Sequence, residues 1–84
     1  MTWRVVFEPR VDAAIDRLPE PQRGRIRAAI SRLARDPYVI SNVKALQGGG
    51  YRLRVGDWRV IYHLRDDVLV ILVLRVAHRR DVYR

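Results

Sequence analysis

The sequence predicts an α+β domain in which one strand and two helices precede a run of antiparallel strands. Three observations lead to this fold class: a β-branched and aromatic segment at the start, two segments with apolar residues at helical spacing, and three further strand-like segments joined by short turns. The expected order is β-α-α-β-β-β, with the N-terminal strand and the helical hairpin packed on one face of a twisted, mainly antiparallel sheet. Residues 1–84 are expected to form a single domain.

The first strand is expected at Thr2–Glu8, because TWRVVFE is rich in the β-branched and aromatic residues that favour strands. Pro9 then opens a helix, since the first helical turn leaves its N–H groups unpaired and proline has none to lose. Apolar residues at helical spacing from Val11 to Leu18 mark this first helix, and Pro19 ends it.

A second helix is expected from about Pro21 to Arg35. It stops at Asp36, because the residue before Pro37 is disfavoured in the helical conformation. The two helices therefore form a hairpin with one apolar side, which needs a sheet to cover it. The apolar stripe of the second helix consists of Ile26, Ala29, Ile30, Leu33 and Ala34.

Three strands are expected in the second half of the chain, at Tyr51–Val55, Trp58–Leu64 and Val68–Val76. A loop over residues 38–43 and a flexible Gly48–Gly50 segment precede them. Gly56 and Asp57 form a two-residue turn with glycine first, which joins antiparallel strands tightly. The last strand is continuously apolar and is predicted to be central and buried on both faces.

The two-residue turn fixes the register of the first two of these strands. Val55 pairs with Trp58, and counting outward pairs Arg54 with Arg59. Side-chain alternation then divides the strands into two faces. The face expected to contact the helices carries Tyr51, Leu53, Val55, Trp58, Val60, Tyr62 and Leu64. The opposite face carries Arg52, Arg54, Arg59 and His63, interrupted by Ile61.

Two arginines directly opposite each other on one face of a sheet repel. The cost is roughly 0.2–1 kcal/mol, and a bound anion would reverse its sign. This pattern favours a phosphate-binding surface on the hairpin. The alternative interpretation is the ordinary solvated face of an antiparallel sheet, on which arginine is tolerated.

The positive charge of the chain is almost entirely arginine. The formal net charge is +8, and Lys44 is the only lysine among seventeen basic residues. Arginine presents a planar fork that binds phosphate through two hydrogen bonds, so this composition suits a nucleic-acid ligand. A GC-rich genome would also explain the preference for arginine over lysine, but not the excess of basic over acidic residues.

The sequence has no cysteine, which excludes disulfides, cysteine metal sites and thiol nucleophiles and favours a reducing compartment. The longest apolar run, Val68–Leu74, is far shorter than the roughly 20 residues that span a bilayer. Arg4 and Glu8 interrupt the start of the chain, unlike a signal peptide. We expect a cytoplasmic protein without a membrane partner, bound metal or cofactor.

The end of the chain, Ala77–Arg84, contains one histidine, three arginines and one tyrosine within eight residues. If the last strand neighbours the hairpin, this cluster emerges at an end of the same sheet. The alternative is a charged, frayed tail. The apolar pair Val82 and Tyr83 argues against that alternative, because a solvating tail has no use for it.

Three segments resemble the RelE branch of the RelE/ParE toxins: KALQG at 44–48, YRLRVGDWRVIY at 51–62 and VAHRRDVYR at 76–84. The resemblance covers nearly the whole chain, since the length and the element order also match. It implies a toxin of a type II toxin-antitoxin system that cleaves mRNA in the ribosomal A site without a metal. It also implies a cognate antitoxin partner, through which the toxin-antitoxin complex can bind operator DNA.

The resemblance also implies the site residues. The catalytic set is Arg52, Arg54, Arg59, Arg79 and Tyr83. Further RNA-binding residues are Lys44, His63, His78 and Arg80. Some family members have a lysine on the second strand where this chain has arginine, and arginine essentially cannot lose a proton. Arg52 and Arg54 are therefore expected to bind phosphate, and the proton carrier is His78, His63 or Tyr83, unless general base catalysis is weak.

Two other functions are compatible with the same fold. One is a ParE-like toxin that inhibits DNA gyrase by protein contacts and is not an enzyme. The other is a nucleic-acid-binding module without activity. Fold alone does not separate these functions. The basic set favours the nuclease, because a gyrase inhibitor needs no phosphate-binding sheet.

Overall fold

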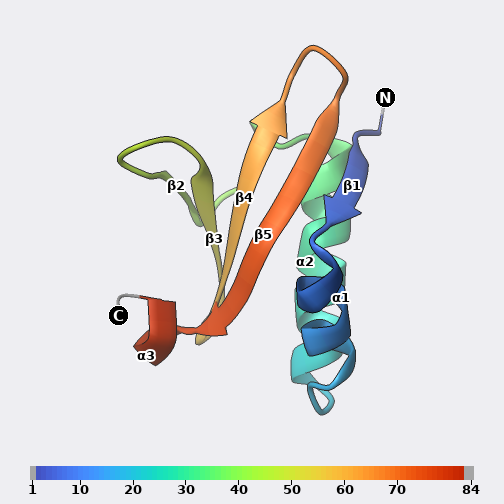
Figure 1. Ribbon diagram of the computed structural model, residues 1–84, viewed down its shortest axis with the longest axis vertical. Helices are drawn as coiled ribbons and strands as arrows, with labels where there is room; N and C mark the ends of the chain where they lie inside the picture. Colours follow the sequence, from blue (N-terminus) through green and yellow to red (C-terminus); the bar gives the residue numbers. More distant parts are fainter. Residues whose placement is uncertain (1, 83–84) are drawn as a thin grey trace.

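A computed structural model describes residues 2–82 of the chain (Figure 1). The elements are β1 (Arg4–Phe7), α1 (Pro9–Asp16), α2 (Gln22–Arg35), β2 (Val43–Ala45), β3 (Tyr51–Val55), β4 (Trp58–Arg65), β5 (Val70–His78) and α3 (Arg79–Val82). The predicted α+β class is confirmed. No helix in this part of the chain is long and apolar enough to cross a membrane.

The strands form one sheet in the order β1-β5-β4-β3-β2. β1 pairs with β5 in parallel, and every other neighbouring pair is antiparallel. The predictions of a mainly antiparallel sheet and of a central last strand are both confirmed. The central position of β5 places the end of the chain beside the β3–β4 hairpin.

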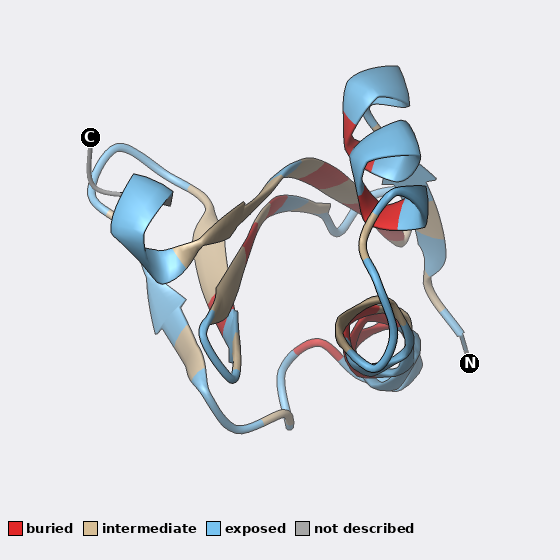
Figure 2. Cartoon of the chain, turned by 90° about the horizontal axis from the view of Figure 1, so that it is seen from below, coloured by how far each residue is buried: buried red, intermediate tan, exposed pale blue. Residues whose placement is uncertain are grey.

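Helices α1 and α2 cover one face of the sheet, whereas α3 lies at the other side of its lower end (Figure 1). Buried residues gather where α1 and α2 meet the sheet, as Figure 2 shows. The helices face the sheet with the apolar stripes that the spacing predicted. The buried core consists of Val11, Ile15, Ile26, Ala29, Ile30, Leu33, Ala34, Leu53, Val60, Tyr62, Ile71 and Val73.

The sheet contains a short strand, β2, that the sequence did not predict. It begins at Val43, the last residue of the expected loop. β2 pairs with β3, with Val43 opposite Leu53 and Ala45 opposite Tyr51. Three residues are too few to give a recognisable alternation, so only the pairing with β3 defines this strand. The turn that follows requires glycines, since Gly48 and Gly50 have φ values of 83° and 84°.

The prediction for β5 was wrong in two respects. The strand begins at Val70 rather than at Val68 and continues to His78. It is not buried on both faces, because α1 and α2 cover only one of them and Arg75 is exposed. A bulge also interrupts its pairing with β4, where Leu74 has no partner in the register. The continuous apolar run gives no sign of the exposed face or of the bulge.

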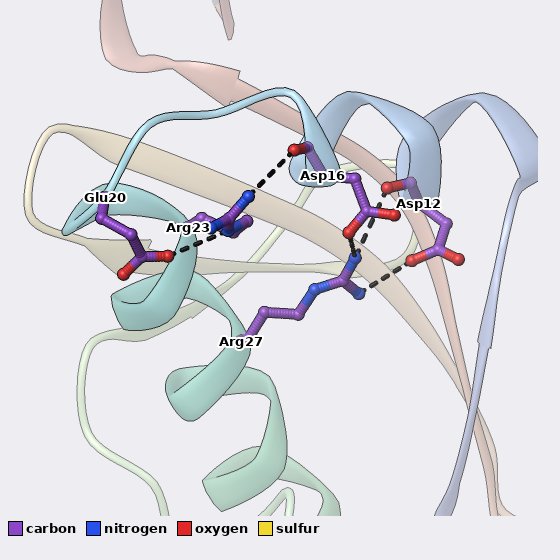
Figure 3. Close-up of polar contacts among 5 residues, drawn as sticks. All are labelled: Asp12, Asp16, Glu20, Arg23 and Arg27. Atoms are coloured by element: carbon purple, nitrogen blue, oxygen red, sulfur yellow. Dashed lines mark hydrogen bonds and ion pairs between the residues drawn. The ribbon is translucent and has the colours of Figure 1, made fainter.

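The two helices of the hairpin are joined by ion pairs (Figure 3). Arg27 on α2 lies 2.8 Å from Asp12 Oδ1 and 2.7 Å from Asp16 Oδ1, both on α1. Its guanidinium also lies 5.4 Å from the centre of the Phe7 ring. Burial acts to lower the pKa of Arg27, but the hydrogen bonds to the two aspartates raise it above the ordinary value. The two aspartates of α1 therefore neutralise Arg27 and attach α1 to α2.

Candidate nucleic-acid interface

The β3–β4 hairpin has the register that the two-residue turn predicted. Val55 pairs with Trp58, and Arg54 lies directly opposite Arg59. Their side chains point to the face of the sheet that α1 and α2 leave uncovered, here called the open face. Lys44 on β2 is opposite Arg52, so it shares this face.

Arg59 is partly buried on the open face. Its Nη1 donates hydrogen bonds to the backbone oxygens of Gly56 at 2.9 Å and Trp58 at 3.0 Å. Its Nε is buried and has no hydrogen-bond partner among residues 2–82. The turn carbonyls therefore hold the guanidinium in place while part of its donor capacity is unused.

Arg59 is surrounded by other positive charges. Burial is the largest cause that lowers the pKa of Arg59, followed by the positive charges of Arg52, Arg54 and Arg79. The carboxylate of Asp57 acts in the opposite direction. Three guanidinium groups thus lie close enough to act on the charge of Arg59 at one end of the open face. We call Arg52, Arg54, Arg59 and Arg79 the arginine cluster.

Arg79 joins this cluster because the end of the chain folds back against the hairpin turn. Its backbone N–H donates to the Asp57 carbonyl oxygen at 2.7 Å, and its Nε lies 3.7 Å from Asp57 Oδ1. Up to Val82 the tail is a short helix rather than a frayed segment. Arg75 on β5 donates from Nη2 to the backbone oxygen of Asp81 at 2.8 Å, which ties this helix to the sheet.

Asn42 positions Arg54 and was missed in the sequence. Its backbone oxygen accepts the Arg54 N–H at 2.9 Å, and its Oδ1 accepts a hydrogen bond from Arg54 Nη2 at 3.1 Å. Asn42 has a φ of 67°, a conformation that asparagine adopts more readily than most residues. An asparagine before a strand was the only signal, and its partner twelve residues away depends on the β2–β3 pairing. Asp57 was likewise expected only as a turn residue.

His63 lies on the open face at a distance from Arg59. It is four residues from Arg59 along β4, which is roughly 13 Å at about 3.3 Å per residue. Its ring lies against Gly50, where a Cβ would come within 2.9 Å of two ring atoms. Position 50 therefore needs glycine both for its positive φ and for the space that the imidazole occupies.

His78 lies on the other side of the sheet from the arginine cluster. It is opposite Trp58 in the β4–β5 register, and the two rings meet edge to face with centroids 5.6 Å apart. Its Nδ1 accepts the backbone N–H of Arg80 at 3.3 Å. His78 therefore supports the start of α3 from the face opposite the cluster.

The remaining predicted site residues divide into two groups. Lys44 is exposed on β2, and Arg80 is exposed on α3. Tyr83 lies outside the described residues, so its predicted role remains a prediction. The structure thus brings together four of the five predicted catalytic residues, and it places Lys44 and His63 on the same face of the sheet.

The arginine cluster is suited to bind a group with more than one negative charge. Guanidinium groups donate several hydrogen bonds in fixed directions and remain positive at any physiological pH, so they stabilise phosphate oxygens directly. They are poor proton acceptors for the same reason. The site can therefore hold and neutralise a phosphodiester, and any proton transfer requires another group.

Comparison with known proteins defines the family. The family model for the ParE toxin of the type II toxin-antitoxin system parDE matches residues 5–83. The chain belongs to the RelE/ParE superfamily of type II toxins. The toxin RelG of Mycobacterium tuberculosis is 29% identical over 77 residues, which cover 90% of this chain and 77% of RelG.

Two solved structures place the toxin in the RelE branch of the superfamily. The archaeal RelE–RelB complex from Pyrococcus horikoshii matches with a TM-score of 0.80 and 30% identity, over 98% of this chain and 100% of the matched one. The toxin-antitoxin complex RelBE2 from Mycobacterium tuberculosis matches with a TM-score of 0.75 and 25% identity, over 94% and 100%. The chain is therefore a toxin of a type II toxin-antitoxin system with a RelE-like fold.

Proposed function

We propose that this toxin is a ribosome-dependent, metal-independent endoribonuclease that cleaves mRNA in the ribosomal A site and so inhibits translation. The observation that carries the proposal is the arginine cluster, in which burial and three like charges lower the pKa of Arg59. Such crowding destabilises an empty site and is relieved when a phosphate binds. The similarity to RelE proteins supports the same function.

In the proposed reaction, the ribose 2′-oxygen attacks the adjacent phosphorus and the bond to the 5′-oxygen breaks. A base outside the arginine cluster takes the proton of the 2′-hydroxyl, an acid gives one to the 5′-oxygen, and the products end in a 2′,3′-cyclic phosphate and a 5′-hydroxyl. Negative charge grows on the phosphate oxygens between these steps. Fixed guanidinium groups stabilise that charge, and one such donor is typically worth about 2.7–4 kcal/mol of the barrier.

The cluster residues have separate tasks in this proposal. Arg52 and Arg54 bind phosphate from β3, while Arg59 and Arg79 neutralise the charge that develops at the reacting phosphate. Tyr83 orients the substrate or stacks on a base. The RNA on either side of the cleaved bond is bound by Lys44, His63 and Arg80. His78, which was predicted to bind RNA, instead acts through its support of α3.

We further propose that a cognate antitoxin binds and silences this toxin in the cytoplasm, and that their complex binds operator DNA through the antitoxin. The matched structures from Pyrococcus horikoshii and Mycobacterium tuberculosis are complexes of a toxin with its antitoxin. The net charge of +8 offers an acidic partner segment a strong attraction.

A reconstituted translation assay tests the proposal. The purified toxin is added to mRNA with and without ribosomes, and the cleavage positions are mapped by primer extension. We expect cuts within translated codons only when ribosomes are present. Intact mRNA, combined with inhibition of gyrase supercoiling by the same protein, would contradict the nuclease and support a ParE-like activity.

A further inference from the structure

A second basic surface lies beside the arginine cluster, on the side of β3 that faces α2. It is a groove of about 330 Å³ between α2 and β3. Arg25 and Arg32 line it from α2, and Arg54 lines it from β3. A hollow of about 240 Å³ next to it is lined by Lys44, Arg52 and Arg54. Arg54 borders both, so the two spaces adjoin at this residue.

The charges along this path have one sign. The residues that line the two hollows include five cations and no carboxylate. Arg25 and Arg32 are exposed, and neither makes an ion pair with residues 2–82. Two other α2 arginines differ, because Glu20 pairs with Arg23 and the aspartates of α1 pair with Arg27. The acidic residues of the helical hairpin thus neutralise the side of α2 that faces α1 and leave the groove positive.

The geometry of α2 keeps the two groove arginines apart. Arg25 and Arg32 are seven residues apart, which is two helical turns and about 10 Å along the axis. They therefore lie on one side of the helix, at a spacing that lets each contact a separate phosphate of an extended strand. Between them the small side chains of Ala28 and Ala29 leave the groove open to its floor at Leu53.

We propose that this groove binds the phosphate backbone of single-stranded RNA that continues from the arginine cluster. The inference rests on the proposed function in taking RNA as the ligand, and it adds a second contact region that the family resemblance did not include. A strand held by Arg52 and Arg54 passes the edge of the sheet at Arg54 and then meets Arg25 and Arg32. RNA is favoured over an acidic peptide, because the groove continues a surface whose guanidinium groups already suit phosphate.

The test uses 2′-O-methyl oligoribonucleotides, which cannot be cleaved because the attacking hydroxyl is blocked. Binding of a trinucleotide and of a nonanucleotide to the full chain is measured across a range of salt concentrations. The variant is Arg25→Gln with Arg32→Gln. The charge-matched control is Arg10→Gln with Arg17→Gln, which removes two exposed arginines in and just after α1.

Each phosphate contact on a single strand contributes about 0.7 to the slope of log affinity against log salt. We expect the groove variant to lower the slope for the nonanucleotide by about 1.4 and to leave the trinucleotide slope unchanged. The control should change neither slope. Circular dichroism melts of all variants check that a smaller salt slope is not caused by unfolding.

Several results would overturn the inference. An unchanged nonanucleotide slope, or an equal loss for the trinucleotide, would show that the groove does not hold an extended strand. The same conclusion would follow if the wild type bound both oligonucleotides with equal slopes, although the proposed function would then stand. Failure of the wild type to bind either one would count against both proposals. If the variant instead lost affinity only for an acidic antitoxin peptide, the occupant would be that peptide.

Discussion

Arg27 and Arg59 are the same residue type in opposite surroundings. Arg27 on α2 lies between two aspartates, and its pKa is raised. Arg59 on β4 lies among three arginines, and its pKa is lowered. The first environment stabilises the folded chain without any ligand. The second is costly until an anion binds, and this is the arrangement expected of a binding site.

The contrast shows how the acidic residues are distributed. Asp12, Asp16 and Glu20 all pair with arginines of α2, and Asp67 pairs with Arg65. Among the described residues, only the carboxylate of Asp57, which also lies 3.7 Å from Arg79 Nε, acts on Arg59 in the favourable direction. Position relative to the few carboxylates, rather than the total positive charge, therefore separates structural arginines from those available to a ligand.

The largest effect is expected from Arg59→Gln, which removes the central charge of the cluster. We expect the single-turnover rate of mRNA cleavage on ribosomes to fall by about 10²–10³-fold. The cleavage rate of Arg59→Lys should lie between those of Arg59→Gln and the wild type, because lysine keeps the charge but lacks the planar fork. Arg10→Gln on α1 is the control and should cleave at the wild-type rate. A full rate for Arg59→Gln would remove Arg59 from the proposed chemistry.

A smaller effect, on stability instead of activity, is expected from Arg27→Gln. Loss of two charge-assisted hydrogen bonds, discounted for partial exposure, should lower the free energy of unfolding by roughly 1–2 kcal/mol in urea titrations. Arg23→Gln breaks one exposed pair with Glu20 and a 3.3 Å hydrogen bond to the Asp16 backbone oxygen, and it should cost less than about 0.5 kcal/mol. Equal stability of the two variants would contradict the structural role that we assign to Arg27.

The smallest expected effect is on the stability of the fold at alkaline pH, and it comes from Tyr62 rather than from Arg59. Burial raises the pKa of Tyr62 to about 12, and its hydroxyl has no hydrogen-bond partner among the described residues. The neutral form is therefore favoured in the folded state, and its stabilisation is lost as the pH rises from about 10 towards 12.

Tyr62→Phe should accordingly weaken the loss of stability in this alkaline range. At neutral pH its free energy of unfolding should stay within about 1 kcal/mol of the wild type, because no hydrogen bond is broken. Urea titrations at pH 7 and at pH 11 provide the measurement. An unchanged alkaline loss in the variant would assign it to groups other than Tyr62.

Much of the fold was predictable because the local signals agreed. Pro9, the Asp36-Pro37 pair and the Gly56-Asp57 turn each restrict the backbone, so α1, α2 and the hairpin began or ended close to the expected residues. β2 and the bulge at Leu74 were not predictable. Both arise from pairing between strands rather than from any property of their own few residues.

The candidate site was predictable to the extent that it depends on strand register. Counting outward from the two-residue turn is enough to place Arg54 opposite Arg59. The family resemblance added Arg79, and the structure supplied the hydrogen bond to Asp57 that brings it close. The role of Asn42 and the face of His78 could not be predicted from the sequence. Each depends on where a neighbouring strand lies in three dimensions.

The most direct test of the arginine cluster measures thermal unfolding with a 2′-O-methyl trinucleotide. At about ten times its Kd, a ligand that binds only the folded state adds about 1.4 kcal/mol of stability. We predict this gain for the wild type and for Arg27→Gln, whose Tm starts lower, and no gain for Arg59→Gln. An equal gain in all three proteins would contradict the claim that the arginine cluster, rather than arginine in general, binds the phosphates.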